Sequence, residues 1–416
     1  MKAIVIRSIG GPIEWAEVAR PALPAAASIC DRLAAASLRE TGRTDVCGEG
    51  MVIMGVRMAG ISYADYLGMH GELEKKPRPP LTPGAEACGV VEAAVNSGKF
   101  RVGDKAGAVM PWTCGTCAEA LLLHDYQCVV LPATSGKAEF AEFVGLGADY
   151  VTAFFALKHR SAPILKGGMW QGRALLVLGT AGGVGVAAVE IGACLGASVF
   201  ACAPKAREVD YRRSAPDVRI DSTKRGWHAA VLAARPSGVE VAFDPVGGDA
   251  IFSVIRCLKV GGALLTVGFA SGRVPTVSLE HLLQRNIGIH GVWTSPFQYP
   301  RELEDSAAAV VALWAEKRLT PAVTTVLPMD KFRNGIAMLV VRDYKHKVAL
   351  AIESPDWARA SPATKNPTVR KSAQSTCPDE DAPDAASLMR YFPGDAEDAS
   401  LEDEHTGVPV GIHGDY

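Results

Sequence analysis

One stretch, residues 173–203, constrains the fold more than any other part of this 416-residue chain. An apolar run at residues 175–178 leads directly into a glycine-rich turn, and a helical pattern and a second apolar run at 199–203 follow. Such runs are typical of parallel strands that are buried on both faces. The order strand, glycine turn, helix, strand predicts the first βαβ unit of a dinucleotide-binding domain.

The turn has the residue types that pyrophosphate binding requires. A phosphate approaches the backbone closely only where side chains are absent, and a helix N-terminus offers free N–H groups and a partial positive charge. We therefore expect cofactor contacts from Thr180, Ala181, Gly182, Gly183, Val184 and Gly185. Thr180 stands where the G-x-G-x-x-G pattern begins with glycine. A plain crossover with a glycine-rich turn, binding no nucleotide, is the alternative.

Length and composition restrict the class of protein. The length suits two domains with additional segments. A net charge of −2 gives no electrostatic reason to expect a nucleic-acid or membrane partner. The 10 cysteines are scattered, which favours a reducing compartment over a disulfide framework. The N-terminus lacks signal-peptide character, and no apolar run looks long enough to span a bilayer, so we expect a cytoplasmic protein.

The arrangement of patterns predicts several regions. Short strands and turns before residue 135 are typical of a small β-barrel, interrupted by an insertion at about 25–50. Strand and helix patterns then alternate, with further strands at 239–243, 263–267 and 287–292, which predicts a doubly wound parallel sheet. Residues 354–416 carry acidic clusters and little apolar sequence, so we expect a disordered acidic tail.

Seven motifs follow one another in a fixed order. They are Ala59-Gly-Ile-Ser-Tyr-Ala-Asp65, Pro83-Gly-Ala-Glu-Ala-Cys-Gly-Val-Val91, Val102-Gly-Asp-Lys105, Gly179-Thr-Ala-Gly-Gly-Val-Gly185, Phe243-Asp-Pro-Val-Gly-Gly248, Val267-Gly-Phe-Ala-Ser-Gly272 and residues 286–293. Together they resemble the medium-chain dehydrogenase/reductases, specifically their zinc-independent quinone oxidoreductase (zeta-crystallin-like) branch.

This resemblance implies an α/β architecture of two domains. A GroES-like β-barrel catalytic domain would comprise residues 1–153 and a return segment at 297–353. A Rossmann NADP(H)-binding domain would comprise residues 154–296. It also implies a homodimer in which strand 287–292 pairs with its copy across the sheet edge.

The resemblance also bears on metal binding. Zinc-dependent relatives carry a cysteine and a Gly-His-Glu where this chain has Ser62 and Gly84-Ala85-Glu86, so neither a soft nor an imidazole ligand remains. Cys114 and Cys117 have metal-like spacing, but only Cys128 lies near them downstream. Two ordinary loop cysteines are favoured, and a redox-active pair is the alternative. We expect no metal, which disfavours alcohol oxidation.

The end of the second strand indicates the form of the nicotinamide. Ala203 stands where NAD enzymes carry an acid for the ribose hydroxyl. Lys205 and Arg207, with Arg212 and Arg213 near them, would pair with a 2′-phosphate, which favours NADPH. Solvated charges on a helix face are the alternative interpretation.

The nicotinamide ring is expected at the loops that follow the later strands. The residues expected to hold it are Val246, Gly247, Gly268, Phe269 and Ala270, whose mostly small side chains let the ring approach the backbone. Thr152 resembles a threonine that the family places near the ring. Its alternative role is a hydrogen bond to its own helix turn.

The resemblance implies hydride transfer from NADPH to a quinone or a conjugated enone. Ser62 and Tyr63 would face this acceptor, with Tyr63 donating a hydrogen bond to the developing oxyanion. A packing role for Tyr63 is the alternative.

Two other functions of the protein stay open. One is an enoyl-thioester (enoyl-CoA) reductase, whose proton-donating tyrosine would fall near Leu73. The other is a non-catalytic NADPH- or RNA-binding protein of the zeta-crystallin type, although no aromatic-interleaved basic patch is evident.

Overall fold

The structure is a computed structural model. It describes residues 1–22, 50–72, 79–109, 115–165, 169–205, 211, 215–296, 298–321, 325–341 and 347–352. Nearly all of the insertion expected at 25–50, and all of the tail expected at 354–416, lie outside these residues. The same holds for Leu73, Cys114, Arg207, Arg212 and Arg213.

A six-stranded sheet forms the nucleotide-binding part. Its strands are β8 (Ala174–Leu178), β9 (Ser198–Ala203), β10 (Val218–Asp221), β11 (Val239–Asp244), β12 (Leu258–Thr266) and β13 (Gly288–Gly291). The order is β10-β9-β8-β11-β12-β13, and every neighbouring pair is parallel. The predicted doubly wound sheet is confirmed. The strand order reverses between β8 and β11, which is where such sheets bind ligands at their carboxyl edge.

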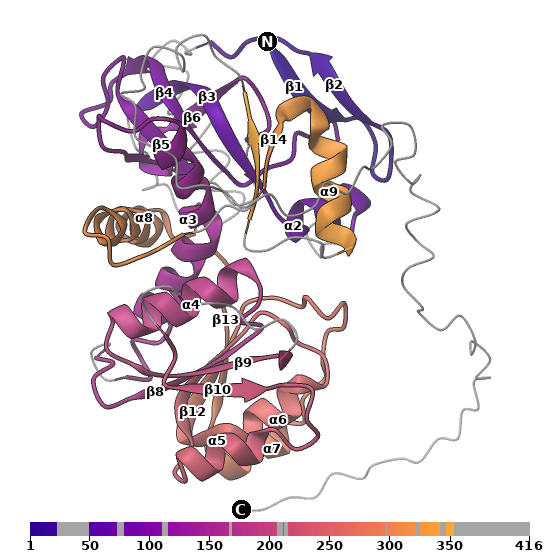
Figure 1. Ribbon diagram of the computed structural model, residues 1–416, viewed down its shortest axis with the longest axis vertical. Coiled ribbons are helices and arrows are strands. Elements are labelled where there is room, and N and C mark those ends of the chain that lie inside the picture. Colours follow the sequence, from indigo (N-terminus) through magenta and orange to yellow (C-terminus); the bar gives the residue numbers. More distant parts are fainter. Residues whose placement is uncertain are drawn as a thin grey trace, which may run out of the picture. The chain divides into compact units, whose positions relative to one another are not determined.

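Helices cover both faces of this sheet. Figure 1 shows α4 (Gly183–Cys194) on one face and α5 (His228–Ala234), α6 (Ala250–Cys257) and α7 (Leu279–Arg285) on the other. Alternate residues of β8 therefore enter different cores: Leu175 and Val177 pack in the cluster that contains α4, and Leu176 packs with α5 and α6. This two-sided burial explains why the strand reads as an unbroken apolar run.

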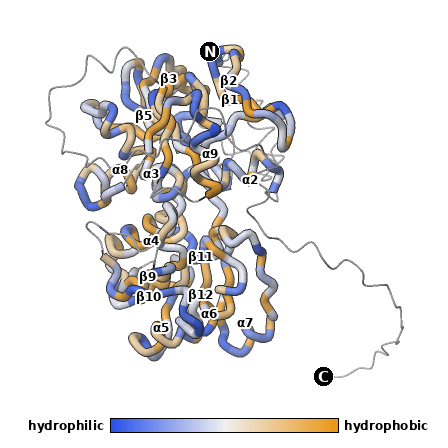
Figure 2. Tube along the Cα trace, turned by 45° about the vertical axis from the view of Figure 1, so that its right-hand side comes forward, coloured by the Kyte–Doolittle hydropathy of each residue, from blue (hydrophilic) through white to orange (hydrophobic). Residues whose placement is uncertain are grey.

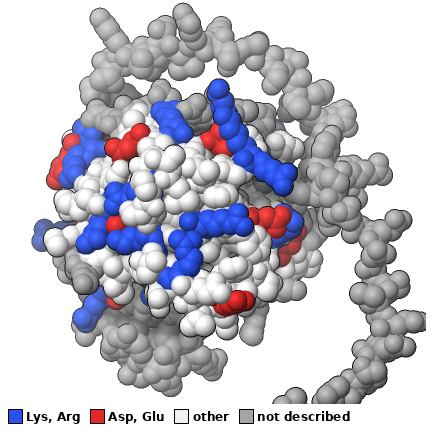
Figure 3. All heavy atoms as spheres, turned by 90° about the horizontal axis from the view of Figure 1, so that it is seen from below, with Lys and Arg blue, Asp and Glu red and all other residues white. Residues whose placement is uncertain are grey.

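The face seen from below in Figure 3, where α5, α6 and α7 lie, is rich in lysine and arginine. Three cations of these helices and the adjoining segments have internal partners. Arg285 donates to the Leu258 carbonyl and to two carbonyls at the end of α6, where a cation complements the helix dipole. Arg235 and Lys259 donate to the buried carboxylate of Glu240 at 3.3 and 3.0 Å. These three cations thus stabilise the end of α6 and one buried carboxylate.

A seven-stranded sheet forms the other part. Its strands are β3 (Met51–Ile61), β4 (Glu86–Val95), β5 (Lys105–Val109), β6 (Ala120–His124), β7 (Cys128–Val130), β14 (Thr325–Pro328) and β15 (Val348–Ala351). The order is β14-β15-β3-β4-β5-β7, and β6 also pairs with β3. β15 pairs antiparallel with β3, so the last described strand joins the same sheet as strands from the first third of the chain. β1 (Lys2–Ile6) and β2 (Ile13–Glu17) form a separate hairpin.

The seven-stranded sheet is accompanied by four helices among the described residues, of which α3 is the longest. They are α2 (Tyr63–His70), α3 (Lys137–Phe155), α8 (Pro300–Ala315) and α9 (Phe332–Val341), with short turns η1 (Asp125–Gln127), η2 (Ala156–Arg160) and η4 (Met329–Lys331). α3 packs against α4 and α8 and supplies much of the apolar core. In Figure 2 apolar residues are concentrated in the strands and inner helices, and polar residues in the turns and outer helices.

The helical segment Lys137–Arg160 departs from one expectation. Among the described residues it is long and apolar enough to cross a membrane. Its most apolar window is 67% buried within the protein. This burial is typical of a core helix, whose apolar side chains are covered by neighbouring elements.

A buried carboxylate joins α3, α4 and the segment after α8. Glu190 is 2% exposed and accepts hydrogen bonds from the Tyr150 hydroxyl at 2.9 Å and the Thr320 hydroxyl at 2.8 Å. Burial, together with the Glu190 carboxylate, raises the pKa of Tyr150 well above its usual value, so the phenol remains a donor. A buried acid is tolerated when its oxygens are hydrogen-bonded in this way.

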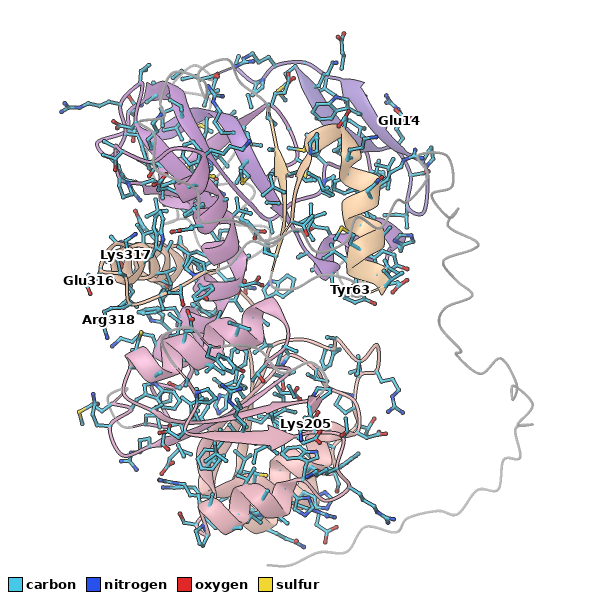
Figure 4. All side chains as sticks on the ribbon, viewed as in Figure 1. Glu14, Tyr63, Lys205, Glu316, Lys317 and Arg318 are labelled. Atoms are coloured by element: carbon cyan, nitrogen blue, oxygen red, sulfur yellow. The ribbon has the colours of Figure 1, made fainter. Side chains whose placement is uncertain are left out.

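We predict that Glu190→Ala lowers the free energy of unfolding by about 2–3 kcal/mol, because it leaves buried donors without an acceptor. The matched control is Glu316→Ala, which removes an exposed partner of Arg318 (Figure 4). The control should change stability by no more than about 0.5 kcal/mol. Urea unfolding curves measure both, and equal curves for the two variants would contradict the role given to Glu190.

Candidate functional site

The glycine turn lies at the carboxyl end of β8, and α4 begins at Gly183 after the cap residue Gly182. A Cβ on Gly185 would lie 2.3 Å from the Gly179 carbonyl oxygen, so helix and strand meet too closely for any side chain there. A Cβ on Gly179 would lie 2.8 Å from Val246. The first N–H groups of α4 have no intrahelical acceptor, which makes the turn a cradle for an anion.

The loop after β11 is fixed beside this turn by a buried acid. Asp244 is 1% exposed, and its Oδ1 accepts the N–H groups of Val246 at 2.8 Å and Gly247 at 3.0 Å. Burial raises the pKa of Asp244, and the two backbone donors act against this shift. The carboxyl therefore fixes the backbone of the loop after β11, which lies beside the glycine turn.

The loop after β12 joins the same edge. Ala270 donates its N–H to the Pro245 carbonyl at 3.0 Å, and a Cβ on Gly247 would lie 2.7 Å from the Phe269 ring. The Gly268 carbonyl oxygen also lies close, 3.5 Å from the Cβ position of Gly247. The structure thus brings together the glycine turn and the five residues expected around the nicotinamide ring, and their contact with a cofactor stays a prediction.

An acid that the sequence did not indicate lies beside the end of β9. Ala203 pairs with Asp221 at the end of β10, a strand that was not predicted. The Asp221 carboxylate accepts hydrogen bonds from the N–H of Lys205 at 3.3 Å and from the hydroxyl of Thr223 at 2.7 Å. The Thr223 hydrogen bonds lower the pKa of Asp221, so the carboxylate remains charged. A negative charge therefore lies beside Lys205, which is exposed (Figure 4).

A tyrosine and an arginine near the glycine turn were also not foreseen. Tyr211 is 8% exposed and donates its hydroxyl to the Thr180 carbonyl at 3.3 Å. The guanidinium of Arg219 lies 5.2 Å from the centre of the Tyr211 ring, within cation–π range. Arg219 thus adds a positive charge close to the place where a dinucleotide phosphate is expected.

A buried lysine forms the centre of the second half of the site. Lys347 is 4% exposed, and its Nζ lies 2.8 Å from Glu86 Oε1 and 3.3 Å from Asp149 Oδ2. Burial opposes the charge on Lys347, but the carboxylates of Asp149 and Glu86 outweigh it and raise its pKa. We call these three residues the lysine–carboxylate cluster.

The cluster is built around an interruption of α3. The helix is non-helical at Gly147, where a Cβ would lie 2.6 Å from the Glu86 side chain. The freed N–H of Ala148 donates to Glu86 Oε2 at 3.1 Å. Asp149 follows directly, and its Oδ2 lies only 2.2 Å from the Cβ position of Gly183. Through this contact the cluster reaches the start of α4.

The expected acceptor-facing residues lie at the other end of the cluster. Val348 pairs with Ile61, so Lys347 follows the same strand pair toward Ser62 at the start of α2. The carboxyl of Asp65 accepts the Ser62 N–H at 2.8 Å and lies 3.0 Å from the Ser62 hydroxyl. Tyr63 is partly exposed at the beginning of α2 (Figure 4), and its ring stacks on Tyr66 with centroids 5.5 Å apart. Thr152 lies on α3, three residues after Asp149.

The donors at this end do not fit a zinc ion. Ser62 and Ala85 offer neither thiolate nor imidazole, and Glu86 is paired with Lys347. Cys117 is buried, and burial raises the pKa of its thiol well above the usual value, whereas a ligand must be a thiolate. Across the described parts of the chain, no three His, Cys, Asp or Glu side chains are grouped so that they could hold a metal.

Comparison with known proteins agrees with this architecture. The family described as alcohol dehydrogenase GroES-like domain matches residues 48–156, and the family described as zinc-binding dehydrogenase matches residues 183–311. The chain belongs to the medium-chain dehydrogenase/reductase superfamily. Within it, the chain is quinone oxidoreductase-like, as the following relatives show.

A quinone oxidoreductase-like protein 2 homolog from Nematostella vectensis is 27% identical over 318 residues, which are 74% of this chain and 83% of that protein. A solved structure of a probable oxidoreductase from Mycobacterium abscessus is 27% identical, with a TM-score of 0.66 over 85% of this chain and 99% of that one. The quinone oxidoreductase from Thermus thermophilus, solved also with NADPH, shares the fold at 23% identity, with a TM-score of 0.64 over 85% of this chain and all of that one. These findings support an oxidoreductase with a nicotinamide cofactor.

We predict that Asp149→Asn strengthens dinucleotide binding, because it removes a negative charge from the N-terminus of α4. The expected gain in affinity is roughly fivefold, which corresponds to about 1 kcal/mol for one charge at a helix end. Calorimetric titration with NADPH and with ADP measures it. The control is Glu14→Gln, an exposed acid paired with Arg7 on the hairpin (Figure 4), which should leave the affinity unchanged. Unchanged or weaker binding by Asp149→Asn would contradict the assignment of the anion site.

Proposed function

We propose that the protein is an NADPH-dependent quinone oxidoreductase that reduces a quinone or a conjugated enone without zinc. One observation supports this proposal: the lysine–carboxylate cluster lies between the glycine turn, where we expect the pyrophosphate, and the strand end at Ser62, where we expect the acceptor and where the donors do not fit a metal. The bound cofactor would supply a hydride from its nicotinamide ring. The protein's residues bind and orient both reactants and exclude water from them.

The residues have separate tasks in this proposal. The free N–H groups at the start of α4 hold the pyrophosphate. The loops at Val246–Gly247 and Gly268–Ala270 support the nicotinamide ring, since the contacts within and between them leave little room to move. Ser62 and Tyr63 line the acceptor, where a hydroxyl can donate to oxygen as negative charge develops on it.

An activated acceptor fits a site without a metal. Alcohol oxidation needs a Lewis acid to stabilise an alkoxide. A quinone or an enone is already electrophilic and accepts hydride without one. Quinone oxidoreductase-like relatives support this choice of acceptor.

For assembly we propose a homodimer in the cytoplasm. β13 is the outer strand of the six-stranded sheet as the structure describes it, and the exposed Ile289 and Trp293 lie on or beside it. Pairing of two β13 strands would cover an open edge.

The proposal is tested by measuring NADPH and NADH oxidation with a panel of quinones, enones and enoyl-CoA. We expect turnover with quinones and enones, faster with NADPH than with NADH. Tight NADPH binding without turnover of any acceptor would overturn the enzymatic proposal. Preference for enoyl-CoA would point to the alternative thioester reductase.

The NADPH preference has its own test. Lys205→Ala combined with Arg207→Ala should raise the KM for NADPH roughly tenfold, because it removes charge-assisted hydrogen bonds to the 2′-phosphate. The KM for NADH should not change. Asp221→Asn should lower the KM for NADPH, since it removes the negative charge beside Lys205. If both variants leave the ratio of the NADPH and NADH KM values unchanged, the 2′-phosphate does not bind here.

A further inference from the structure

Reduction by hydride transfer creates a need for a proton. When an enone or a quinone accepts a hydride, the product is an anion, and one proton must reach it before it leaves. Both residues expected at the acceptor, Ser62 and Tyr63, carry a hydroxyl, and that of Ser62 contacts a carboxyl. A serine hydroxyl is too weak an acid to act without such a partner. A second group must therefore supply a proton to the Ser62 hydroxyl.

We propose that Asp65, acting through the hydroxyl of Ser62, delivers this proton to the reduced acceptor. The inference rests on the proposed function, and it concerns two residues that lie three positions apart in the sequence. Its structural basis is the contact between Ser62 Oγ and Asp65 Oδ2 at 3.0 Å.

The two side chains are held in place from several sides. Asp65 Oδ1 accepts the N–H of Gly84 at 2.6 Å, and Oδ2 accepts the N–H of Ser62 at 2.8 Å. With both oxygens fixed by the backbone, the carboxyl cannot turn away from the serine hydroxyl. Ser62 itself is partly exposed, so a ligand can reach its oxygen. The pair is thus oriented before any ligand binds, which is what proton transfer requires.

The strand pair β3–β15 relates this pair of residues to the glycine turn. Ser62 follows β3, and Lys347 precedes its antiparallel partner β15. Lys347 contacts Asp149, and Asp149 lies against Gly183 at the glycine turn. An acceptor at Ser62 would therefore lie at one end of a strand pair whose other member carries the lysine–carboxylate cluster to the expected dinucleotide site.

The surroundings of Asp65 act on its pKa in both directions, and the balance is upward. Although the residue keeps part of its surface exposed, its carboxyl is enclosed by protein, and burial raises its pKa. Hydrogen bonds from Gly84 and Ser62 and the charge of Lys347 act in the opposite direction. Glu86 and Cys117 are further titratable groups that interact electrostatically with Asp65. The helix α9 packs against α2, and its one charged residue, Arg333, donates a hydrogen bond to the Ile13 carbonyl. Asp65 thus keeps its proton to a higher pH than an ordinary aspartate.

The proton step balances with the hydride step. The Ser62 O–H bond breaks as its proton moves to the anionic acceptor, and the Asp65 O–H proton moves to Ser62 Oγ. Asp65 is left as a carboxylate, which its two backbone N–H donors and the re-formed serine hydroxyl stabilise. Water returns one proton to Asp65 after the product leaves. One acceptor, one NADPH and one proton are consumed for each reduced product and NADP⁺.

A purely structural role is the competing interpretation. Ser-x-x-Asp is a capping pattern, and the bond from the Ser62 N–H to Asp65 is half of such a cap. Ser62→Ala separates the two roles, because it removes the hydroxyl and keeps both backbone donors on Asp65. Ser62→Thr restores a hydroxyl at the same atom. Asp65→Asn removes the acid and tests the source of the proton.

The kinetic experiment measures kcat against pH for the full-length protein with an enone and NADPH. In the parent protein kcat should fall as pH rises through the pKa of Asp65, since the relay needs the protonated acid. Ser62→Ala should lower kcat by roughly 100-fold with little change in the KM for NADPH, and Ser62→Thr should recover most of it. Asp65→Asn should be slow and should lack this pH-dependent decline.

A second measurement does not depend on turnover. Infrared spectra of the cofactor-free protein, labelled with ¹³C in its aspartate carboxyls, should show a protonated acid band that titrates above the usual range and is absent in Asp65→Asn. Asp244, whose pKa burial also raises, should contribute a band that Asp65→Asn leaves in place. If Ser62→Ala keeps the parent rate and pH profile, the relay is overturned while the proposed function stands. If Asp65 titrates as an ordinary aspartate, the relay is likewise wrong. If the parent protein turns over no acceptor, the proposed function fails and the relay fails with it.

Discussion

The ion pairs of one buried lysine determine how this site is assembled. Lys347 lies almost fully inside the protein, between the carboxylates of Glu86 and Asp149. Removing the lysine from such a cluster would leave buried carboxylates without a counter-charge, at a cost of about 3–5 kcal/mol. The three residues come from β4, from α3 and from the start of β15, so the lysine joins these elements. Glu86 also occupies the break in α3 that brings Asp149 to the glycine turn.

The same cluster gives the site its chemical character. Where zinc-dependent relatives bind a metal, this chain has a serine and an alanine, and the nearby glutamate is neutralised by an ammonium group. The positive charge is thus fixed in the protein and is not available to polarise an alcohol. What remains at the acceptor is a hydroxyl that an aspartate orients from behind. Such an arrangement suits an acceptor that is already electrophilic and needs only a hydride and a proton.

Local patterns in the sequence predicted much of the fold and part of the site. The turn at 179–185 was found because strand, glycines and helix follow one another directly, and the loops after β11 and β12 were found by the same logic. β10 was missed because it is a short outer strand with alternating polar residues, and Asp221 was missed with it. Lys347 pairs with residues 198 and 261 positions away, and no local pattern reports a contact of that range. Asp65 stood inside a recognised motif, but only the fold shows that its carboxyl meets Ser62.

In the proposed function, an organised cluster of charged side chains, with no metal ion, prepares this site for reduction of an activated acceptor. It is tested most directly by measuring NADPH-dependent quinone reduction on protein purified with a strong chelator, with the metal content of the same sample determined. The account predicts full turnover at far less than one zinc per chain and no stimulation by added zinc. Activity that is lost with the metal and returns when zinc is added would contradict it.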